Sequence, residues 1–325
     1  MRLLTLGGTG FLSGAVVDAA LARGHDVVVV HRGLRGSPPP GVRSVVADRD
    51  DAAGLARALG PLLVGPGAPD AVIDTCGYTV AGAAAAARVL GDVPRYVQVS
   101  SISAYRHWPP GPVRSEDDET FGPEDDLTAY GPMKAQSELV LGAALGARLL
   151  AVRAGLIVGP GDRTRRLTGW LHRIATRPRV AVPAGLDQPI AVVDVRDLAG
   201  WLVEAAGRPW SGAVTATGPA GMATFGGLLE ACRAAVLAAG GTAATLVPLA
   251  DDVLLAGGVQ PWSDLPFWLP ADVARTAWDV DTRRARELGL PTRAVELSVA
   301  DAWAWVLASG LDHPDVPAHV EALAR

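Results

Sequence analysis

The sequence contains no asparagine and a single lysine, Lys134, and these scarcities narrow the functions open to the chain. Without asparagine the chain offers no acceptor for N-glycosylation. The other 28 of its 29 basic residues are arginines, and they form no block along a chain of net charge −5. Broad binding to nucleic acid or to an anionic membrane needs a concentrated positive patch, so we expect neither. A small molecule is the expected partner.

Cysteine and long apolar runs are also scarce. The two cysteines, Cys76 and Cys232, are too few for a disulfide framework or a zinc site, so we predict a reducing, cytoplasmic location and no bound metal. The first apolar run ends before Gly7, too early for a signal peptide, and no uninterrupted run of about 18 apolar residues follows. We therefore expect no membrane segment.

Apolar residues as a class are plentiful. Of the 325 residues, 49% are hydrophobic and 19% are charged, and the mean hydropathy is +0.24. These proportions allow a large buried core. The length indicates about two domains, or one large α/β domain with a smaller one attached.

Short apolar runs alternate with helical patterns through the first half of the chain. Strands are predicted at residues 2–6, 26–30, 42–47, 71–75, 95–100 and 149–158. Helices are predicted after the first strand and at residues 51–59, 81–90 and 128–145. The run at 26–30 is continuous enough to be buried on both faces, as in a parallel sheet. The alternation predicts an α/β fold of the Rossmann type, with a doubly wound parallel sheet.

The second half is less regular and predicts a smaller C-terminal substrate lobe. Here the predicted strands are 180–182 and 190–193, and the predicted helices are 167–175 and 195–206. We place the dinucleotide-binding domain at 1–160, with 189–217 returning to it, and the lobe at 161–188 and 218–325. Eight of the nine tryptophans lie from Trp170 onward, so the lobe is expected to be lined by aromatic side chains. Residues 105–127, which include a proline-rich stretch and an acidic run, are expected to form a long exposed loop.

A glycine-rich turn directly follows the first strand and opens a helix, as a dinucleotide-binding turn requires. Its residues Gly7, Thr9, Gly10, Phe11 and Leu12 are candidate cofactor ligands, because such a turn brings helix N-terminal amides close to a pyrophosphate. Ser13 stands where the third glycine of the pattern is expected, and serine is small enough for the helix to pack closely. The alternative is a plain tight turn.

The residues after the second strand indicate which dinucleotide is used. NAD is usually recognised by an acidic residue there and NADP by a basic one, and this chain has Arg32, with Arg35 nearby. NADP is therefore favoured over NAD, although an arginine that stacks on adenine would tolerate NAD. Asp48, after the third strand, is placed to hydrogen-bond the adenine amino group, or is an ordinary loop aspartate.

The lone lysine lies four residues after Tyr130, so both side chains are expected on one face of a helix. A nearby cation favours the phenolate and should lower the pKa of Tyr130, which would let the phenol exchange a proton with a carbonyl or alcohol oxygen. Pro132 fits because it falls in the first helical turn. The alternative is a surface lysine one turn after a half-buried tyrosine.

Hydroxyl groups end the predicted strand 95–100. Ser101 is our choice to hydrogen-bond the substrate oxygen, with Ser103 second, because ligands of open α/β sheets bind at the carboxyl edge. The alternative role for Ser101 is to cap the end of the strand.

Together these motifs resemble the extended short-chain dehydrogenase/reductase family, also called the NAD-dependent epimerase/dehydratase family. The resemblance covers about the first 200 residues and is closest to bacterial reductases grouped near the flavonoid-type reductases. The segments that carry it are residues 7–12, 100–105, 130–134, 153–160 and 190–198. The resemblance implies that Ser101, Tyr130 and Lys134 form a catalytic triad. It also implies that Cys76 and Gly77, next to Thr75, line the cofactor cleft and that the turn at 154–155 faces the nicotinamide.

The missing asparagine bears on the substrate. Family members that act on nucleotide sugars typically have an asparagine shortly after the strand equivalent to 148–154, so a nucleotide sugar is less expected here. The tryptophans of the lobe favour a planar or apolar carbonyl compound through stacking, although each such tryptophan is more often core than pocket. The four considered are Trp170, Trp262, Trp268 and Trp278.

Three functions remain open. The leading one is an NADPH-dependent reductase that delivers hydride to a ketone or an aldehyde, with Ser101 and Tyr130 polarising the oxygen. The second is an epimerase or dehydratase that retains its NAD and reoxidises it in each cycle. The third is a non-catalytic dinucleotide sensor, against which the Tyr130 and Lys134 pair speaks. A homodimer formed through two helices of one sheet face is a further expectation.

Overall fold

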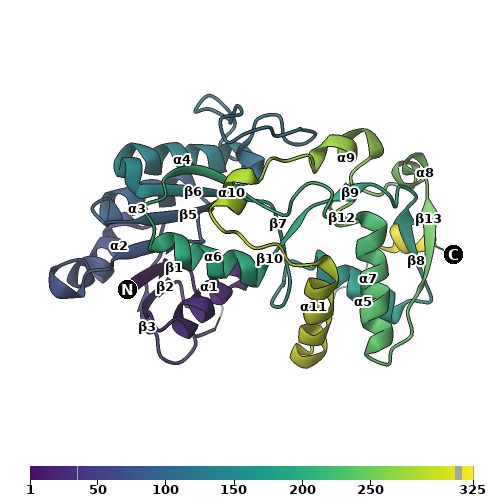
Figure 1. The fold of residues 1–325 in the computed structure, drawn as a ribbon, viewed down its shortest axis with the longest axis horizontal. Helices are drawn as coiled ribbons and strands as arrows, with labels where there is room; N and C mark the ends of the chain where they lie inside the picture. The colour runs from purple at the N-terminus through teal and green to yellow at the C-terminus, as the bar shows by residue number, and fades with distance from the viewer. Residues whose placement is uncertain (35, 312–316, 325) are drawn as a thin grey trace.

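A seven-stranded parallel sheet, built mainly from the first half of the chain with one strand from the second, forms one part of the protein (Figure 1). The computed structural model describes residues 1–34, 36–311 and 317–324. The strand order is β11-β6-β5-β4-β1-β2-β3, and every neighbouring pair runs parallel. The strands are β1 (Arg2–Leu6), β2 (Asp26–His31), β3 (Arg43–Val46), β4 (Ala71–Asp74), β5 (Tyr96–Ser101), β6 (Leu149–Ala154) and β11 (Gly212–Ala216). The predicted doubly wound Rossmann-type sheet is confirmed.

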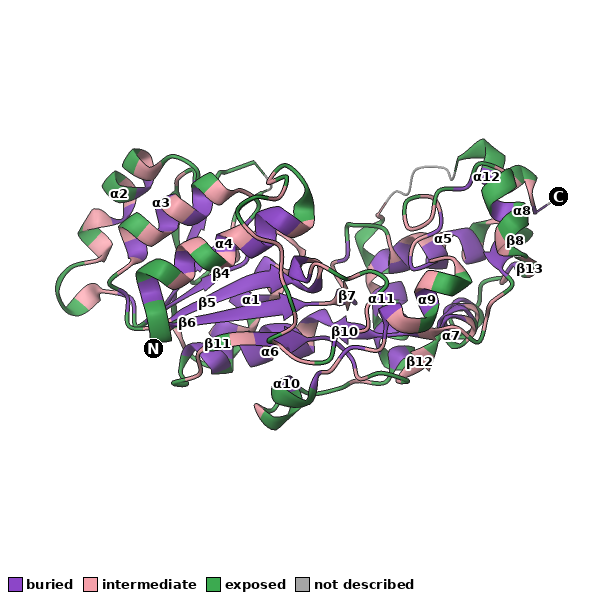
Figure 2. Cartoon of the chain, turned by 90° about the horizontal axis from the view of Figure 1, so that it is seen from above, coloured by how far each residue is buried: buried purple, intermediate pink, exposed green. Residues whose placement is uncertain are grey.

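Helices cover both faces of the sheet because the central strands are apolar on both sides. One face is covered by α1 (Phe11–Ala22) and α6 (Val195–Ala206), and the other by α2 (Ala52–Leu59), α3 (Val80–Leu90) and α4 (Tyr130–Leu145). Figure 2 shows the buried strands running between these layers toward the second half of the chain. The carboxyl ends of β1, β4 and β5 therefore face that half, where an open α/β sheet binds its ligands.

Two predicted strands are wrong in their extent. The run predicted at 149–158 breaks after Ala154 and continues as β7 (Leu156–Val158), which pairs with β10 (Val192–Asp194) instead of the main sheet. The run predicted at 190–193 likewise divides into β9 (Pro189–Ile190) and β10. The break falls at Gly155, where a Cβ would collide with Thr217 and where the backbone N–H donates to Ala216 O at 3.0 Å. The chain thus leaves the main sheet at Gly155, where it contacts the end of β11.

The second half of the chain packs around a separate apolar core, seen beyond β7 and β10 in Figure 2. Trp170 and Trp268, with 0% and 1% exposure, are its most deeply buried tryptophans. Its remaining elements are α5 (Leu167–Thr176), β8 (Arg179–Pro183), β12 (Ala223–Thr224), α7 (Phe225–Ala238), β13 (Thr245–Leu249), α8 (Asp251–Ala256), α9 (Ala271–Ala277), α11 (Val295–Ser309) and α12 (Ala318–Ala322). The short helix α10 (Arg283–Glu287) instead packs against β11, and its Ala285 belongs to the core of the main sheet. The domain boundaries at 160, 189 and 217 stay a prediction.

The long loop after β5 is bound to the second half of the chain. Its Trp108 Nε1 donates to Ala277 O at 2.7 Å, and Val113 N donates to Asp279 O at 3.1 Å. At its base, Arg106 forms an ion pair with Asp125 at 2.7 Å. The loop therefore bridges the sheet and the segment after α9.

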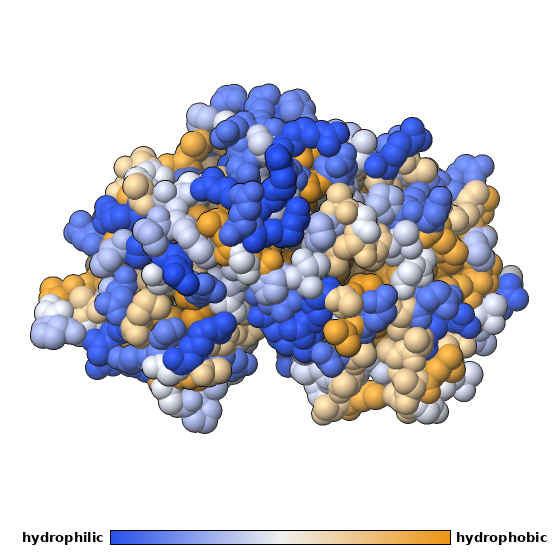
Figure 3. Space-filling model, in the orientation of Figure 1, coloured by the Kyte–Doolittle hydropathy of each residue, from blue (hydrophilic) through white to orange (hydrophobic). Residues whose placement is uncertain are grey.

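The surface differs between the two halves. In the view of Figure 3, hydrophilic side chains dominate over the sheet, whereas apolar side chains gather over α7 and α11 at the lower right. The exposed apolar side chains of those two helices include Leu237, Leu297 and Leu307. Within the described residues, the helices are too short or too polar to cross a membrane.

Candidate active site

The glycine turn between β1 and α1 is shaped for close approach of a ligand. Gly7 has φ +90°, and a Cβ there would collide with Cys76 Sγ, so only glycine fits this turn. Gly10 caps α1, which begins at Phe11, and its N–H donates to Ser13 Oγ at 2.9 Å. Ser13 is thus accommodated at the third position of the pattern. The first turn of α1 presents N–H groups that suit a phosphate, and the absence of Cβ atoms leaves the cradle that a dinucleotide requires.

A second part of the predicted cofactor site is a cleft of about 540 Å³ beside β2 and β3. Arg32 and Asp48 both line it, as does Arg57 of α2, which sequence reasoning missed. Among the described residues neither arginine has a hydrogen bond or ion pair, so both guanidinium groups are available to an anion. Asp48 accepts a hydrogen bond from the Asp50 N–H at 3.0 Å. Arg35, expected to assist Arg32, lies outside the described residues.

Tyr130, Lys134 and Ser101 come together at the carboxyl end of β5. Tyr130 and Lys134 lie on the first turns of α4, and the Lys134 Nζ is 5.6 Å from the centre of the Tyr130 ring. Gly131 lets this turn approach β5 closely, because a Cβ there would collide with Ser103 O. Ser101 is only 8% exposed, and its hydroxyl lies close enough to the Tyr130 side chain to favour the phenolate.

Ser101 caps a backbone turn and keeps a hydroxyl proton for a second partner. Its Oγ accepts from the Ser103 N–H at 3.1 Å and caps the short 3-10 turn Ile102–Ala104, so the predicted capping is present. A hydroxyl that accepts one hydrogen bond still has a proton to donate. That proton can go to Tyr130 or to a bound oxygen.

The electrostatics of Tyr130 differ from the prediction. Withdrawal of its hydroxyl from water raises its pKa above 10.0, while the nearby Ser101 hydroxyl and the charge of Arg166 act in the opposite direction. The predicted lowering by Lys134 is wrong, because the ammonium lies 5.6 Å from the ring centre and is not among the groups that shift the pKa of Tyr130. Sequence reasoning also missed Arg166, which has no local spacing to Tyr130 and reaches it from the chain before α5.

Lys134 is almost completely buried, with 3% exposure. Its Nζ donates to Val99 O at 3.2 Å and lies 5.0 Å from the ring centre of Tyr78, a residue missed from the sequence. Burial lowers the pKa of Lys134 from 10.5 to about 8, although Asp74 favours its charged form. The amine can therefore change its charge close to neutral pH.

A buried ion pair lies next to the lysine. Arg49 Nη2 donates to Asp74 Oδ2, which also accepts from the Tyr96 hydroxyl at 2.7 Å. Asp74 Oδ1 accepts from the Cys76 N–H at 3.0 Å, so the carboxylate fixes the segment 75–77 that we expect to line the cofactor cleft. Asp74 is a charged residue near the end of the apolar run 71–75, and this is the feature of the sequence that could have revealed the ion pair.

The predicted stacking role of the lobe tryptophans is mostly wrong. Trp170, Trp268 and Trp278 are at most 2% exposed and belong to the apolar core, so they have no surface for a substrate. Trp262 is only partly buried, and the guanidinium of Arg166 lies 5.8 Å from its ring centre. It is the one of the four that retains surface for a ligand.

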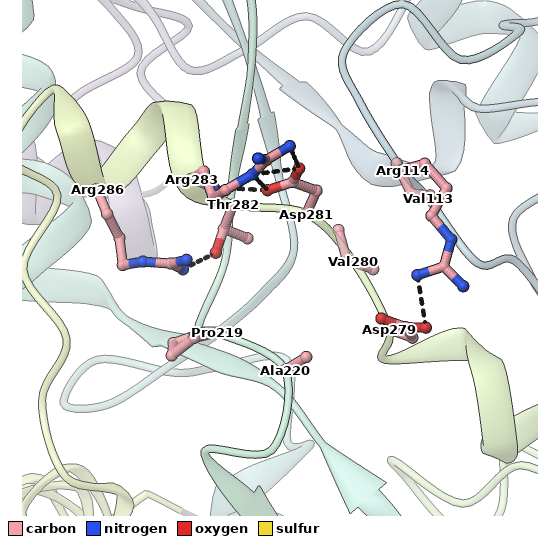
Figure 4. Close-up of a pocket in the computed structure, with 10 residues that line it drawn as sticks. All are labelled: Val113, Arg114, Pro219, Ala220, Asp279, Val280, Asp281, Thr282, Arg283 and Arg286. Carbon is pink, nitrogen blue, oxygen red and sulfur yellow. Dashed lines mark hydrogen bonds and ion pairs between the residues drawn. The ribbon is translucent and has the colours of Figure 1, made fainter.

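Another cleft, of about 430 Å³, lies between the loop after β5, the chain after β11 and the start of α10 (Figure 4). Its arginines are already engaged: Arg114 pairs with Asp279 at 2.8 Å and Arg283 with Asp281 at 2.6 Å. Arg286 donates to Thr282. None of the residues predicted for the active site lines this cleft. Among the described residues, no three His, Cys, Asp or Glu side chains are grouped as metal ligands would be.

Comparisons with known proteins find one family and one fold. The model of the NAD dependent epimerase/dehydratase family matches residues 3–215. A 2′-dehydrokanamycin reductase from Streptomyces kanamyceticus is 34% identical over 196 residues, or 57% of this chain, and the match spans about half (52%) of that relative's length.

Solved structures superpose over nearly the whole chain. The Bordetella bronchiseptica enzyme WbmH in complex with NAD+ has a TM-score of 0.71 at 18% identity and covers 95% of this chain and 99% of its own. The UDP-glucose 4-epimerase of Thermus thermophilus in complex with NAD has a TM-score of 0.67 at 18% identity and covers 95% and 100%. At this identity the likeness establishes the fold.

Proposed function

The chain belongs to the NAD dependent epimerase/dehydratase family, and from that premise we propose that it is a reductase that uses a nicotinamide dinucleotide to reduce a ketone or an aldehyde. The observation that carries the proposal is the meeting of Ser101, Tyr130 and Lys134 at one end of the sheet. A phenol with a serine hydroxyl close to it and a buried amine behind its ring is suited to proton transfer. A sensor of dinucleotides would need no such arrangement.

Tyr130 has a proton to give at neutral pH. Its pKa is raised above the ordinary value of 10.0, so the phenol stays protonated there. We propose that Tyr130 donates this proton to the substrate oxygen while Ser101 donates a hydrogen bond to the same atom. Both groups then stabilise the negative charge that develops there during reduction.

The cofactor site proposed for this chain follows the surface from the glycine turn to Lys134. When bound, the nicotinamide dinucleotide supplies the hydride. The residues proposed to hold it are Gly7, Thr9, Gly10, Phe11, Leu12, Arg32, Asp48, Cys76, Gly77 and Lys134. We further propose NADP as the preferred form, because Arg32 and Arg57 flank the outer cleft with no partner among the described residues.

The substrate is proposed to be a small carbonyl compound. The relative from Streptomyces is by name a reductase of a dehydro compound, which supports reduction over epimerisation for this chain. The argument for a planar or apolar substrate now rests on Trp262 alone, since the other three lobe tryptophans are core. A homodimer stays a prediction.

Replacement of Tyr130 tests the chemistry. We expect Tyr130→Phe to reduce NADPH-dependent turnover of a carbonyl panel by at least about 100-fold, the scale of general acid catalysis, while cofactor affinity stays within about twofold. Cofactor fluorescence gives the affinity and absorbance gives the turnover. Retained turnover in Tyr130→Phe would exclude the phenol as the acid. A wild-type protein purified with tightly held NAD and no net NADPH consumption would instead indicate an epimerase or dehydratase.

Titration with NADPH and NADH tests the cofactor preference. We expect Arg32→Ala and Arg57→Ala each to weaken NADPH binding about tenfold while NADH binding changes little, since a hydrogen-bonded charge pair contributes about 1.5–3 kcal/mol. Arg88→Ala on α3 is the matched control, an exposed arginine that does not line this cleft. Equal wild-type affinity for both dinucleotides would refute the preference.

A further inference from the structure

Arg166 lies beside Tyr130 without a polar partner. Its charge acts on the Tyr130 hydroxyl, and its guanidinium carbon is 5.8 Å from the centre of the Trp262 ring. Tyr130 is 49% exposed, so a ligand can reach this part of the surface from solvent. Within the part of the chain that the structure describes, the guanidinium forms no hydrogen bond or ion pair. Arg166 is there an unpaired cation next to the proposed acid.

Asp162, the acidic residue of the same segment, does not neutralise Arg166. It is fully buried, and its Oδ1 accepts from the Thr164 N–H at 2.8 Å and from the Thr164 hydroxyl at 2.5 Å. Its Oδ2 makes no hydrogen bond, to Arg166 or to any other described residue. The Asp162 side chain therefore fixes the backbone before α5 and leaves the guanidinium of Arg166 for another anion.

Both segments that bring Arg166 and Trp262 together have left-handed backbone. The described non-glycine residues with positive φ are Arg165 at +65°, Trp262 at +68° and Phe267 at +72°. This conformation is unfavourable for residues with a Cβ, so it persists only where surrounding contacts enforce it, and it concentrates at binding and catalytic sites. Here it occurs directly before Arg166 and at Trp262 itself.

The indole of Trp262 is held from behind by the lobe. It stacks on Trp278 with ring centres 6.3 Å apart and planes at 21°, and the Trp262 N–H donates to Trp268 O at 3.1 Å. Both of these tryptophans belong to the apolar core. An indole face attracts a cation, so a fixed Trp262 limits the positions that the guanidinium can take. A side chain held in this way loses less entropy when it binds a ligand.

We propose that Arg166 binds an oxyanion group of the substrate, a carboxylate or a phosphate, while the carbonyl oxygen of the substrate lies at Tyr130. The guanidinium presents N–H donors in a planar fork that matches two oxygens of such a group. A neutral substrate would leave this cation unpaired, and a cationic one would be repelled. The inference rests on the proposed function, because it takes the substrate to lie at Tyr130. It adds a negative charge to the carbonyl compound proposed as the substrate.

A phosphate of the dinucleotide is the competing anion. Arg32 and Arg57 line the outer cleft proposed for the cofactor, and Arg166 does not. Its neighbours are the proposed acid and a tryptophan of the lobe. This position favours the substrate over the cofactor as the source of the oxyanion.

Binding of three unreactive probes to the NADP-saturated protein tests the site. Benzoate and phenyl phosphate carry the two kinds of oxyanion, and benzamide has the shape of benzoate without its charge. In calorimetric titrations of the wild type, one of the anions should bind at least about tenfold more tightly than benzamide. The preferred anion distinguishes a carboxylate from a phosphate. No saturable binding of either anion, or equal affinity for all three probes, would overturn the proposal.

Variants of Arg166 assign the binding to its side chain. Arg166→Gln should weaken binding of the preferred anion at least about tenfold and change that of benzamide by less than about twofold. Arg166→Lys keeps the charge without the fork, so its affinity should be intermediate. Arg163→Gln is the matched control, because it removes the same charge from an exposed arginine in the same segment, and it should change each affinity by less than about twofold. An equal loss in Arg163→Gln would refute the site in favour of diffuse attraction.

Cofactor affinity completes the test. NADPH should bind Arg166→Gln within about twofold of the wild type, which also shows that the variant is folded, whereas a tenfold loss would assign Arg166 to the cofactor and overturn the proposal. The probes are not reduced, so the two proposals can fail separately. Binding that depends on Arg166 in a protein that reduces no carbonyl compound would remove the reductase function and keep the oxyanion site. An active reductase whose Arg166→Gln variant binds the anion normally would do the reverse.

Discussion

The charge of Lys134 can be followed directly, because the chain contains no other lysine. Burial lowers its pKa from 10.5 to about 8. At pH 7 about nine tenths of the molecules then carry the ammonium, but at pH 9 only about one tenth do. An exposed lysine would remain almost fully charged at pH 9. Any step that needs the charged side chain should therefore weaken about ninefold between these two pH values.

The assay is an NMR titration of protein labelled with ¹³C at the lysine Cε. One side-chain signal is expected, with a midpoint near pH 8 in the folded protein and near the ordinary value in urea. The affinity for the cofactor should fall as the pH rises, with the same midpoint. A folded-state midpoint at or above the ordinary value of 10.5 would refute the reasoning, because it would mean that burial does not disfavour the charge.

The lowered pKa of Lys134 also predicts how the free energy of unfolding depends on pH. The folded pKa is below the unfolded one, so between pH 8 and 10.5 the unfolded chain holds a proton that the folded chain has lost, and Lys134 makes stability rise with pH. Below about pH 8 the buried charge costs about 3 kcal/mol. Lys134→Met should therefore be more stable than the wild type by up to about 3 kcal/mol at pH 7, and the difference should vanish above about pH 11. Urea unfolding at both pH values measures this, and a less stable variant at pH 7 would contradict it.

Three other changes have definite expected outcomes. Gly131→Ala should lower the free energy of unfolding by about 1–3 kcal/mol and reduce turnover, because its Cβ collides with the backbone after β5, whereas Gly142→Ala on the same helix should be neutral or slightly stabilising in urea unfolding. Arg49→Met should cost about 3–5 kcal/mol, since it leaves the fully buried Asp74 without its ion-pair partner, and a calorimetric Tm equal to that of the wild type would contradict this. Tyr78→Ala should admit water to Lys134 and raise its NMR titration midpoint toward 10.5. Tyr78→Phe keeps the ring and should leave the midpoint unchanged. Equal midpoints in the two variants would exclude a role of the Tyr78 ring in shielding Lys134 from water.

The main sheet could be predicted closely because its signals are local. The β-branched run at 26–30 became β2 (Asp26–His31), and the first strand has the predicted bounds, Arg2–Leu6. The strand predicted at 149–158 was too long because Gly155 lies inside a continuous apolar run. What ends β6 there is its partner strand β11, which is distant in the sequence. No local sequence pattern reveals a pairing between strands so far apart in the chain.

The parts of the site that depend on the spacing of residues along one helix could be predicted. The parts that depend on how separate segments pack together could not. Tyr130 and Lys134 share a helix, so their four-residue spacing brought them to one face. Tyr78 and Arg166 reach the same place from loops, and no spacing links them to α4. The direction of the Tyr130 pKa was wrong for a related reason, since it depends on burial and on which side of the ring the ammonium lies.

The position of the one lysine follows from the physics of its surroundings. The interior beside it already contains the guanidinium of Arg49, and the nearby Asp74 carboxylate already accepts from that arginine, Tyr96 and a backbone N–H. An arginine at 134 would keep its charge at every working pH and would stay buried without a carboxylate of its own. A lysine can release its proton there, as its pKa of about 8 indicates. A chain that uses arginine at its 28 other basic positions thus has a physical reason to use lysine at this one.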